Sequence, residues 1–241
     1  MKILGFTSIR SDFDLLFPLY KRFQLDKNSE IKLIVSGAHL SPQFGNSVEL
    51  IRKEGFDCYE IETLINSDTH VSRIKSSSIL LQSSIDFITH YKPDVILFAG
   101  DREDALIAAM IGGYLEIPTV HFYGGDHVSD GHIDNSTRHA CSKLASIHMV
   151  CLDSHEKRLI NMGESPKRIF KIGNITLEKF KNIKPYSIKI INQKLNTKKY
   201  FSDFCVVIFH PLYNEINHYF KSFCDLIDSL LDEKLNVFIS A

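Results

Sequence analysis

The segment Pro93-Asp-Val-Ile-Leu-Phe-Ala-Gly-Asp-Arg-Glu-Asp104 carries the clearest secondary-structure signal in the chain. Its first half is a short, continuous apolar run, which is typical of a strand covered on both faces in a parallel sheet. The run ends at Gly100-Asp101-Arg102, and an alanine-rich helix is predicted to follow, with Glu103 and Asp104 in its first turn, where acidic residues favour the helix dipole. A buried strand leading directly into a helix indicates an α/β domain.

The same alternation of strand and helix extends on both sides of this segment. Strands are predicted near residues 2–8, 31–35, 59–61, 118–120, 146–152 and 168–172, and helices from about 13, over 47–54 and 72–91, near 134 and over 154–162. Ser11 or Asp12 is expected to cap the first helix. This order predicts a doubly wound α/β fold with a parallel sheet over residues 1–180.

The last quarter of the chain has a different composition. Residues 181–200 are rich in lysine and asparagine and are predicted to form a linker with a surface helix. A strand at 204–209, a helix at 214–231 and a strand at 236–240 are expected after it. A β-α-β unit of about 40 residues rarely buries enough surface to fold alone. We therefore expect residues 201–241 to be the start of an incomplete nucleotide-binding domain.

Composition excludes several classes of partner. With 44% hydrophobic and 24% charged residues and a net charge of −1, the chain has no basic surplus for nucleic acid or an anionic membrane. The five cysteines are scattered without a C-x-x-C pair, which favours free thiols in a reducing compartment. No apolar run approaches the roughly 18 residues of a membrane span. We predict a cytoplasmic protein that binds a small molecule and needs no cofactor.

A second stretch, His121-Phe-Tyr-Gly-Gly-Asp-His-Val-Ser-Asp-Gly-His-Ile-Asp-Asn-Ser-Thr-Arg-His139, is the strongest functional signal. Six of the eleven histidines lie between His121 and His155. The stretch is predicted to be a loop at the carboxyl end of a strand, where α/β sheets bind ligands. Such a concentration of titratable groups is typical of a functional site.

The chemistry of this loop leaves alternatives open. Gly124-Gly125 permits close approach of the backbone to a ligand, or simply forms a turn. Asp134 and Arg138 are four residues apart on a helix and form either an ion pair or a carboxylate site facing the pocket. Several loop residues could ligate a metal, but no helical H-x-x-x-H spacing is present, so we predict no metal site. The residues considered for a metal are Asp126, His127, Asp130, His132 and Asp134.

Charged residues elsewhere point to a phosphorylated ligand. Arg10, Arg102 and His210 lie beside predicted loops and suit an anionic phosphate. Asp101 follows a buried strand, where a carboxylate can transfer protons to a bound substrate. These residues together predict a nucleotide-linked substrate held between two domains.

Eight short motifs occur in one order and spacing across nearly the whole chain. They are Thr7-Ser-Ile-Arg10-Ser-Asp12, Ser36-Gly-Ala-His39-Leu-Ser41, Gly100-Asp101-Arg102, His121-Phe-Tyr-Gly124-Gly125-Asp126, Ile133-Asp134, Arg138-His139, Gly163-Glu164 and Phe209-His210-Pro211. The set resembles the hydrolysing UDP-N-acetylglucosamine 2-epimerases, which serve the synthesis of sialic acid-type sugars. A similar branch acts on UDP-diacetamido-trideoxy sugars.

The resemblance implies a two-domain GT-B-like fold with the substrate in the cleft. The implied reaction removes the C2 proton, eliminates UDP in an anti sense to give a glycal, and adds water to release the free 2-epimer. Asp101 and Asp134 match catalytic carboxylates of the family, and His210 matches a histidine near UDP. The remaining matched positions are expected to bind the sugar or the nucleotide: Arg10, His39, Arg102, His121, Gly124, Gly125, Arg138 and His139.

Two positions depart from the family pattern. Tyr123 stands where non-hydrolysing relatives carry glutamate, and a phenol, with a pKa near about 10, is a weak base. Asp126 stands where hydrolysing relatives often carry glutamate, and we predict that it takes the same catalytic role. Because the second domain is expected to be incomplete, we predict little turnover by the 241-residue chain alone. A homo-oligomer is also expected.

Two other functions fit the same residues. A GT-B glycosyltransferase would transfer the sugar to an acceptor, because that fold hosts both chemistries. A non-catalytic sugar-nucleotide-binding protein is favoured by Tyr123 and by the short second domain. Release of a free 2-epimeric sugar would separate the epimerase from both.

Overall fold

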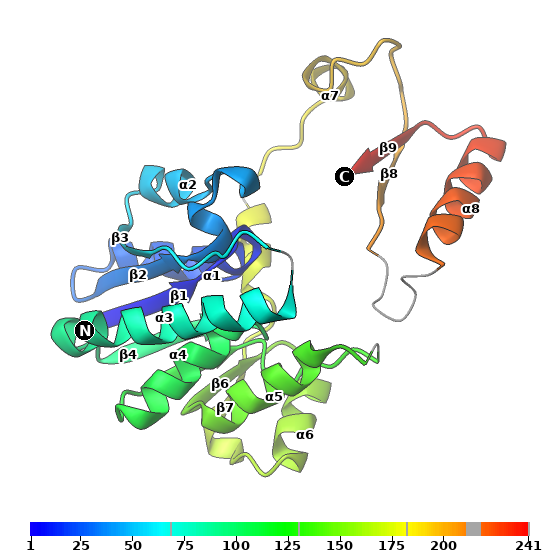
Figure 1. The fold of residues 1–241 in the computed structure, drawn as a ribbon. Helices are drawn as coiled ribbons and strands as arrows, with labels where there is room; N and C mark the ends of the chain where they lie inside the picture. Colours follow the sequence, from blue (N-terminus) through cyan, green and yellow to red (C-terminus); the bar gives the residue numbers. More distant parts are fainter. Residues whose placement is uncertain (68, 130, 182, 211–217, 241) are drawn as a thin grey trace. The chain divides into compact units, whose positions relative to one another are not determined.

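The chain divides into two compact units (Figure 1). The computed structural model describes residues 1–67, 69–129, 131–181, 183–210 and 218–240. The first unit comprises Met1–His127 and Ile133–Lys179, and the second comprises Val128–His132 and Phe180–Ala241.

A seven-stranded sheet in which every neighbouring pair is parallel forms the centre of the first unit. Its strands are β1 (Lys2–Thr7), β2 (Glu30–Ser36), β3 (Asp57–Ile61), β4 (Val95–Ala99), β5 (Thr119–Phe122), β6 (Ile147–Val150) and β7 (Ile169–Lys171). The strand order is β3-β2-β1-β4-β5-β6-β7, so the chain reverses its direction of growth between β1 and β4. Ligand crevices form at such a switch point, outside the carboxyl ends of the strands.

Helices cover both faces of this sheet, as the predicted doubly wound α/β fold requires. Leu4 and Phe6 of β1 pack in one core cluster with residues of α3 and α4, whereas Ile3 packs in a second cluster with residues of α1 and α2. This alternation follows from the two-residue period of a strand. The helices of the unit are α1 (Arg10–Leu25), α2 (Val48–Lys53), α3 (His70–Tyr91), α4 (Glu103–Tyr114), α5 (Ile133–Leu144) and α6 (Asp153–Asn161).

Two local predictions were wrong. β5 continues to Phe122, so His121 is a buried strand residue and not part of the following loop. Helix α1 begins at Arg10 with Ile9 as its N-cap and without a capping side chain, so neither Ser11 nor Asp12 caps it. The Asp12 side chain is only 12% exposed, because it turns into the protein instead of back to the helix end.

The second unit contains one β-α-β arrangement. Strands β8 (Cys205–Ile208) and β9 (Val237–Ser240) pair in parallel, and α8 (Tyr219–Asp232) lies between them in sequence. The short helix α7 (Ile188–Lys194) precedes them and is capped by Ser187. Residues 214–217 of the predicted helix 214–231 lie outside the described residues. Among the helices that the structure describes, none is both long and apolar enough to cross a membrane.

Candidate functional site

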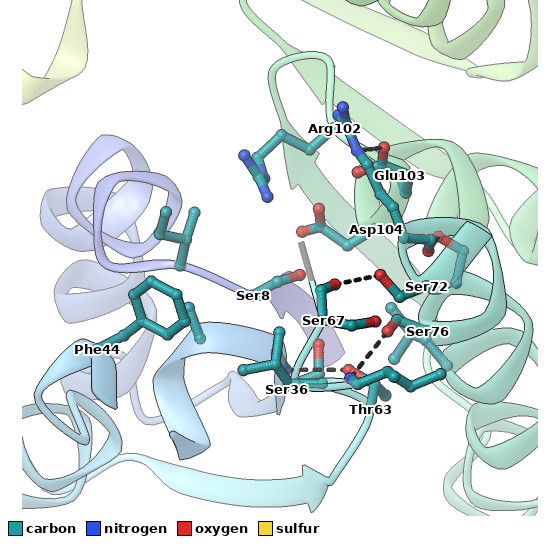
Figure 2. A pocket seen from close by; sticks show the side chains of 18 of the residues that line it. Ser8, Ser36, Phe44, Thr63, Ser67, Ser72, Ser76, Arg102, Glu103 and Asp104 are labelled. Carbon is teal, nitrogen blue, oxygen red and sulfur yellow. Dashed lines mark hydrogen bonds and ion pairs between the residues drawn. The ribbon is translucent and has the colours of Figure 1, made fainter. Parts of the chain in front are cut away.

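A cavity of about 650 Å³ opens at the switch point of the first unit, and we call it the switch-point cavity (Figure 2). The loops after β1, β2, β3 and β4 and the first turns of α3 line it. Its lining is rich in hydroxyl groups and carries two cationic and two anionic side chains, which suits a polar ligand. The charged residues are Arg73, Arg102, Glu103 and Asp104.

Asp101 lies in the loop after β4 and is held by a cation from another helix. The Arg138 guanidinium, only 9% exposed, contacts Asp101 Oδ2, and its Nη1 donates to Asn135 Oδ1 at 3.3 Å. Burial lowers the pKa of Arg138 from its ordinary value, but a guanidinium remains charged at neutral pH. The ion pair therefore fixes the Asp101 carboxylate beside helix α5.

Asp134 lies in the first turn of α5, four residues before Arg138. Its Oδ1 is 4.0 Å from Nη2 of Arg73, and Nε of Arg73 pairs with Glu103 Oε1. Arg73 and Glu103 both line the switch-point cavity. Asp101 and Asp134 thus lie at the same edge of the sheet, and Arg73 connects Asp134 to the cavity wall. Neither aspartate is among the cavity-lining residues themselves.

The predicted loop around the glycine pair is tightly built against α6. A Cβ on Gly125, which has φ +76°, would lie 2.4 Å from the carbonyl oxygen of His155, and Arg158 Nη1 donates to the Gly125 carbonyl. Only glycine allows this approach. Asp126 follows, with its Oδ1 accepting from the His127 amide at 2.8 Å and lying 3.3 Å from His155 Nε2. Its side chain remains 47% exposed and therefore accessible to a ligand.

His39 and His121 are completely buried and bonded within the protein. His121 Nε2 donates to the Gly100 carbonyl at 2.8 Å, and Nδ1 lies 3.1 Å from Ser142 Oγ. His39 lies between Thr7 Oγ1 at 2.9 Å and Ser47 Oγ at 2.8 Å. Burial lowers the pKa of each imidazole to about 4, so both rings are neutral at physiological pH. Their observed contacts fix the loops after β1, β2 and β4, and their part in ligand binding stays a prediction.

The remaining predicted positions are dispersed. Arg10 is exposed on α1, 3.8 Å from Asp14. His139 of α5 stacks on His127 with ring centroids 5.9 Å apart, and burial, followed by the charge of His127, lowers its pKa. A Cβ on Gly124 would meet His121 Nδ1 at 3.0 Å. His210 is exposed after β8 in the second unit, and Pro211 of its motif lies outside the described residues.

Comparison with known proteins identifies the family to which the chain belongs. A family model described as UDP-N-acetylglucosamine 2-epimerase matches residues 21–241. The chain belongs to this epimerase family.

Relatives within the family include enzymes named as hydrolysing 2-epimerases. A "GDP/UDP-N,N'-diacetylbacillosamine 2-epimerase (hydrolyzing)" of Campylobacter jejuni is 32% identical over 229 residues, which cover 95% of this chain and 59% of the relative. A "UDP-N,N'-diacetylbacillosamine 2-epimerase (hydrolyzing)" of Legionella pneumophila is 31% identical over 240 residues, covering 98% and 62%. The chain thus spans about three fifths of the length of these relatives.

Solved structures confirm the predicted α/β, GT-B-like fold of this family member. A Neisseria meningitidis UDP-GlcNAc 2-epimerase bound to UDP-GlcNAc superposes with a TM-score of 0.79 at 16% identity, covering 99% of this chain and 65% of the other. A Methanocaldococcus jannaschii UDP-GlcNAc 2-epimerase in complex with UDP-GlcNAc and UDP has a TM-score of 0.79 at 16% identity, covering 100% and 66%.

Two carboxylates of this epimerase-family chain were not predicted as site residues. Asp104 is 7% exposed and lines the switch-point cavity, and Asp12 is close by on α1. Burial, followed by the charge of the neighbouring Asp104, raises the pKa of Asp12 to about 8. Burial likewise raises the pKa of Asp104. Both residues follow strands that flank the switch point, β1 and β4. Their position after these strands is the feature of the sequence that could have indicated them as site residues.

Tyr123, the departure from the family pattern, does not behave as a base. Burial, followed by the charge of Cys151, raises the pKa of its phenol to about 12. The hydroxyl donates toward the Leu15 carbonyl and Asn174 Oδ1, each at 3.3 Å. The phenol is therefore protonated at neutral pH and serves to join the loop after β5 to neighbouring segments.

Metal ligation finds no support in the described part of the chain. Within it, no group of three or more His, Cys, Asp and Glu side chains is placed to hold a metal ion. Asp130, one of the residues considered as a ligand, lies outside the described residues.

Proposed function

We propose that the protein is a hydrolysing UDP-sugar 2-epimerase that converts a UDP-2-acetamido sugar to UDP and the free 2-epimer. The observation that carries the proposal is the pairing of Asp101 with Arg138, one helical turn from Asp134, at the sheet edge of a family member. Two carboxylates held near one cation supply a proton acceptor and a proton donor without a metal.

In the proposed reaction, one carboxylate accepts the C2 proton as the C1–O bond to the diphosphate breaks and a C1–C2 double bond forms. Water then adds across that double bond, with its oxygen going to C1 and a proton returning to C2 from the opposite face. Because a C2–H bond is weakly acidic, neutralising the departing diphosphate lowers the barrier as much as the base does. We assign this neutralisation to Arg10 and Arg102, proton transfer to Asp101, Asp126 and Asp134, and a contact near UDP to His210.

The switch-point cavity is the proposed location of polar groups of the substrate. Its hydroxyl lining can donate to and accept from sugar hydroxyl and acetamido groups, while Arg102 offers a cation at one end. The diacetylbacillosamine specificity in the names of two relatives makes a diacetamido sugar the second substrate to test. We also propose that the protein acts in the cytoplasm, in the synthesis of sialic acid-type sugars. A homo-oligomeric state is proposed as well.

The test measures UDP release from UDP-N-acetylglucosamine and UDP-N,N'-diacetylbacillosamine in D₂O, with ¹H NMR of the sugar. We expect slow UDP release and a free sugar that carries deuterium at C2, since the returning proton comes from solvent. Asp101→Asn and Asp134→Asn should each lower the rate at least about 100-fold. Asp86→Asn on the exposed face of α3 is the matched control and should leave the rate unchanged.

Other outcomes select another function. UDP release with retained configuration and no deuterium at C2 would contradict elimination. Binding of both sugar nucleotides without any turnover would support a non-catalytic binding protein, a function that the protonated Tyr123 phenol favours. Transfer of the sugar to an added acceptor would indicate a glycosyltransferase.

A further inference from the structure

Three polar groups that the proposed reaction does not fully use line one end of the switch-point cavity, and a fourth, Asp12, is buried beside them. Ser8 follows β1, Asp12 lies in the first turn of α1, and Arg102 and Asp104 lie at the start of α4. Figure 2 shows Ser8, Arg102 and Asp104 converging on this end. Two loops that flank the switch point therefore bring two carboxyl groups and one guanidinium together.

Two charged side chains of this cluster each have a buried atom without a hydrogen-bond partner, Asp12 Oδ2 and Arg102 Nε. The Ser8 side chain lies against the Asp104 carboxyl. Arg102 Nε and Asp12 Oδ2 are 4.0 Å apart, which is too long for a hydrogen bond but close enough for a charge interaction. A buried polar atom without a partner destabilises the fold, so such an atom is a candidate to bind a ligand or a proton. Arg102 and Asp12 thus attract each other without forming a hydrogen bond between these two atoms.

The surroundings do not favour two ionised carboxylates. Asp104 is 7% exposed and the Asp12 side chain 12% exposed, and among the described residues Arg102 is the cation whose charge acts on both carboxyl groups. The other titratable groups that face the pair are Tyr20 of α1, Glu103 of α4 and Cys141 of α5. Each of these is neutral or negative at neutral pH, and none can balance a second negative charge. Two like charges in one buried place hold a proton between them.

We propose that Asp12 and Asp104 share one proton at the end of the switch-point cavity and thereby determine whether Arg102 is available to the anionic part of a ligand. With the proton in place, the pair carries one negative charge and Arg102 can turn its outer nitrogens to a diphosphate. When the proton leaves, the doubly charged pair attracts the guanidinium and repels an anionic ligand. Asp12 and Asp104 are in this sense positioning residues, and the ligand half of the inference rests on the proposed function.

The direction of the pKa supports this assignment. Burial raises the pKa of Asp12 to about 8, and Asp104 acts in the same direction while Arg102 opposes it. The shared proton is therefore present at neutral pH and lost in mildly alkaline solution. Binding of the ligand and binding of the proton are linked reciprocally. If the proton strengthens the binding of an anionic ligand at Arg102 by a given factor, the bound ligand strengthens the binding of the proton by the same factor and so raises the pKa of the pair.

The first experiment is an NMR titration of the 241-residue chain labelled with ¹³C at the aspartate carboxyl carbons. We expect one aspartate resonance to titrate near pH 8, to disappear in Asp12→Asn and to move below about pH 6 in Asp104→Asn. Asp86→Asn, which removes an exposed aspartate, should leave it in place. If every aspartate titrates below about pH 5, or if the alkaline titration is the same in Asp104→Asn, the shared proton is refuted.

The second experiment measures UDP-N-acetylglucosamine binding by calorimetry between about pH 7 and pH 9. This ligand suits the test because its diphosphate diester keeps a constant charge over that range. We expect the dissociation constant of the wild type to rise about tenfold with pH, and that of Asp104→Asn to stay at the low-pH value. The ligand should also raise the alkaline aspartate titration by about one pH unit, which is the same factor of ten.

The outcomes separate this inference from the proposed function. A pH-independent dissociation constant in the wild type, or equal pH dependence in Asp104→Asn, would refute the role of Arg102. Absence of binding at every pH would refute both the proposed function and the ligand step, while the carboxyl titration still decides the shared proton. Circular dichroism checks that the variants fold, and Asp12→Asn replaces Asp104→Asn in the binding experiment if the latter does not.

Discussion

The guanidinium of Arg138 contacts the carboxylate of Asp101 and joins helix α5 to the loop that follows β4. The two residues are 37 positions apart in sequence, and both side chains are largely withdrawn from solvent, at 9% and 21% exposure. Arg138 also lies one turn after Asp134 on α5. A single arginine thus determines where one candidate catalytic carboxylate lies relative to the other.

Replacing Arg138 with methionine should destabilise the protein substantially. The substitution leaves the Asp101 charge partly buried without its cation, which costs about 2–4 kcal/mol of unfolding free energy. Urea denaturation at pH 7 measures it. Arg22→Met is the control, because Arg22 pairs with Glu178 at the surface at 3.1 Å with 73% of its side chain exposed, and it should cost less than about 1 kcal/mol. Equal losses in the two variants would show that the Asp101 pair has no special role in stability.

His121 should remain neutral in moderately acidic solution. Burial lowers its pKa to about 4, so at pH 5.5 fewer than about one ring in ten should be protonated, whereas an unfolded histidine would be mostly charged. Because the folded pKa is below the unfolded value, the contribution of this ring to stability is present above about pH 6.5 and is lost as pH falls toward 4. NMR of ¹⁵N-labelled histidines measures the protonation directly. A His121 midpoint near pH 6.5 would contradict the observed burial and its bond to the Gly100 carbonyl.

Alanine at Gly125 should be much more harmful than alanine at another glycine with the same backbone angle. Gly125 has φ +76° and faces the His155 carbonyl, whereas Gly173 has φ +74° with nothing within 4 Å of an added Cβ. Gly173→Ala should cost about 1 kcal/mol for the left-handed backbone alone. Gly125→Ala should cost about 2–4 kcal/mol, because the clash with backbone adds to that strain. Thermal unfolding compares them, and similar melting temperatures would show that the loop relaxes freely.

Glu164 should be a second point of large electrostatic stabilisation. Its side chain is 1% exposed and lies 2.6 Å from both Lys143 Nζ and Arg168 Nη2 and 3.3 Å from His148 Nε2. Glu164→Gln should lower the unfolding free energy by about 3–5 kcal/mol at pH 7, because the cations lose their carboxylate. Glu178→Gln, at a half-buried surface position where the side chain is 39% exposed, is the control and should change it by less than about 1 kcal/mol.

The effect of Glu164→Gln should also depend on pH. Burial alone raises the pKa of the Glu164 carboxyl, but the bond from Lys143 and the charges of Lys143, His148 and Arg168 outweigh it, so the net pKa lies below its ordinary value. A carboxylate with a lowered pKa stabilises the protein above about pH 4.5 and loses that contribution as pH falls further. The difference between wild type and variant should therefore shrink below that pH. A constant difference would show that packing, and not charge, sets the cost.

Much of the fold could be predicted because its signals are local. The apolar run 95–99 predicts a buried strand from its own composition. The spacing of apolar residues after it predicts a helix without reference to distant residues. Predictions were wrong where a hydrogen-bond partner distant in sequence allows a polar residue to be buried. His121 looked like a loop residue, but Gly100 and Ser142 bind both of its ring nitrogens and allow it to be buried in β5.

The candidate site has fewer local signals in the sequence than the fold. Asp101 was singled out from its position after a strand, and the motifs that resemble the epimerase family pointed to Asp126 and Asp134. Asp12 and Asp104 were not singled out, because a carboxylate in the first turn of a helix is ordinarily a solvated, dipole-stabilised group. Their burial depends on how α1 and α4 pack beside the same switch point.

The amino-acid sequence by itself determined the alternation of strands and helices, the parallel sheet and the membership of an epimerase family, because periodicity and motif spacing are properties of the chain alone. Only the tertiary structure decided which charges meet: Asp101 with Arg138, Asp12 with Arg102, and Glu164 with Lys143. The physical reason is that strand order and helix packing bring these partners together from separate segments, and burial then sets which protonation state each one adopts.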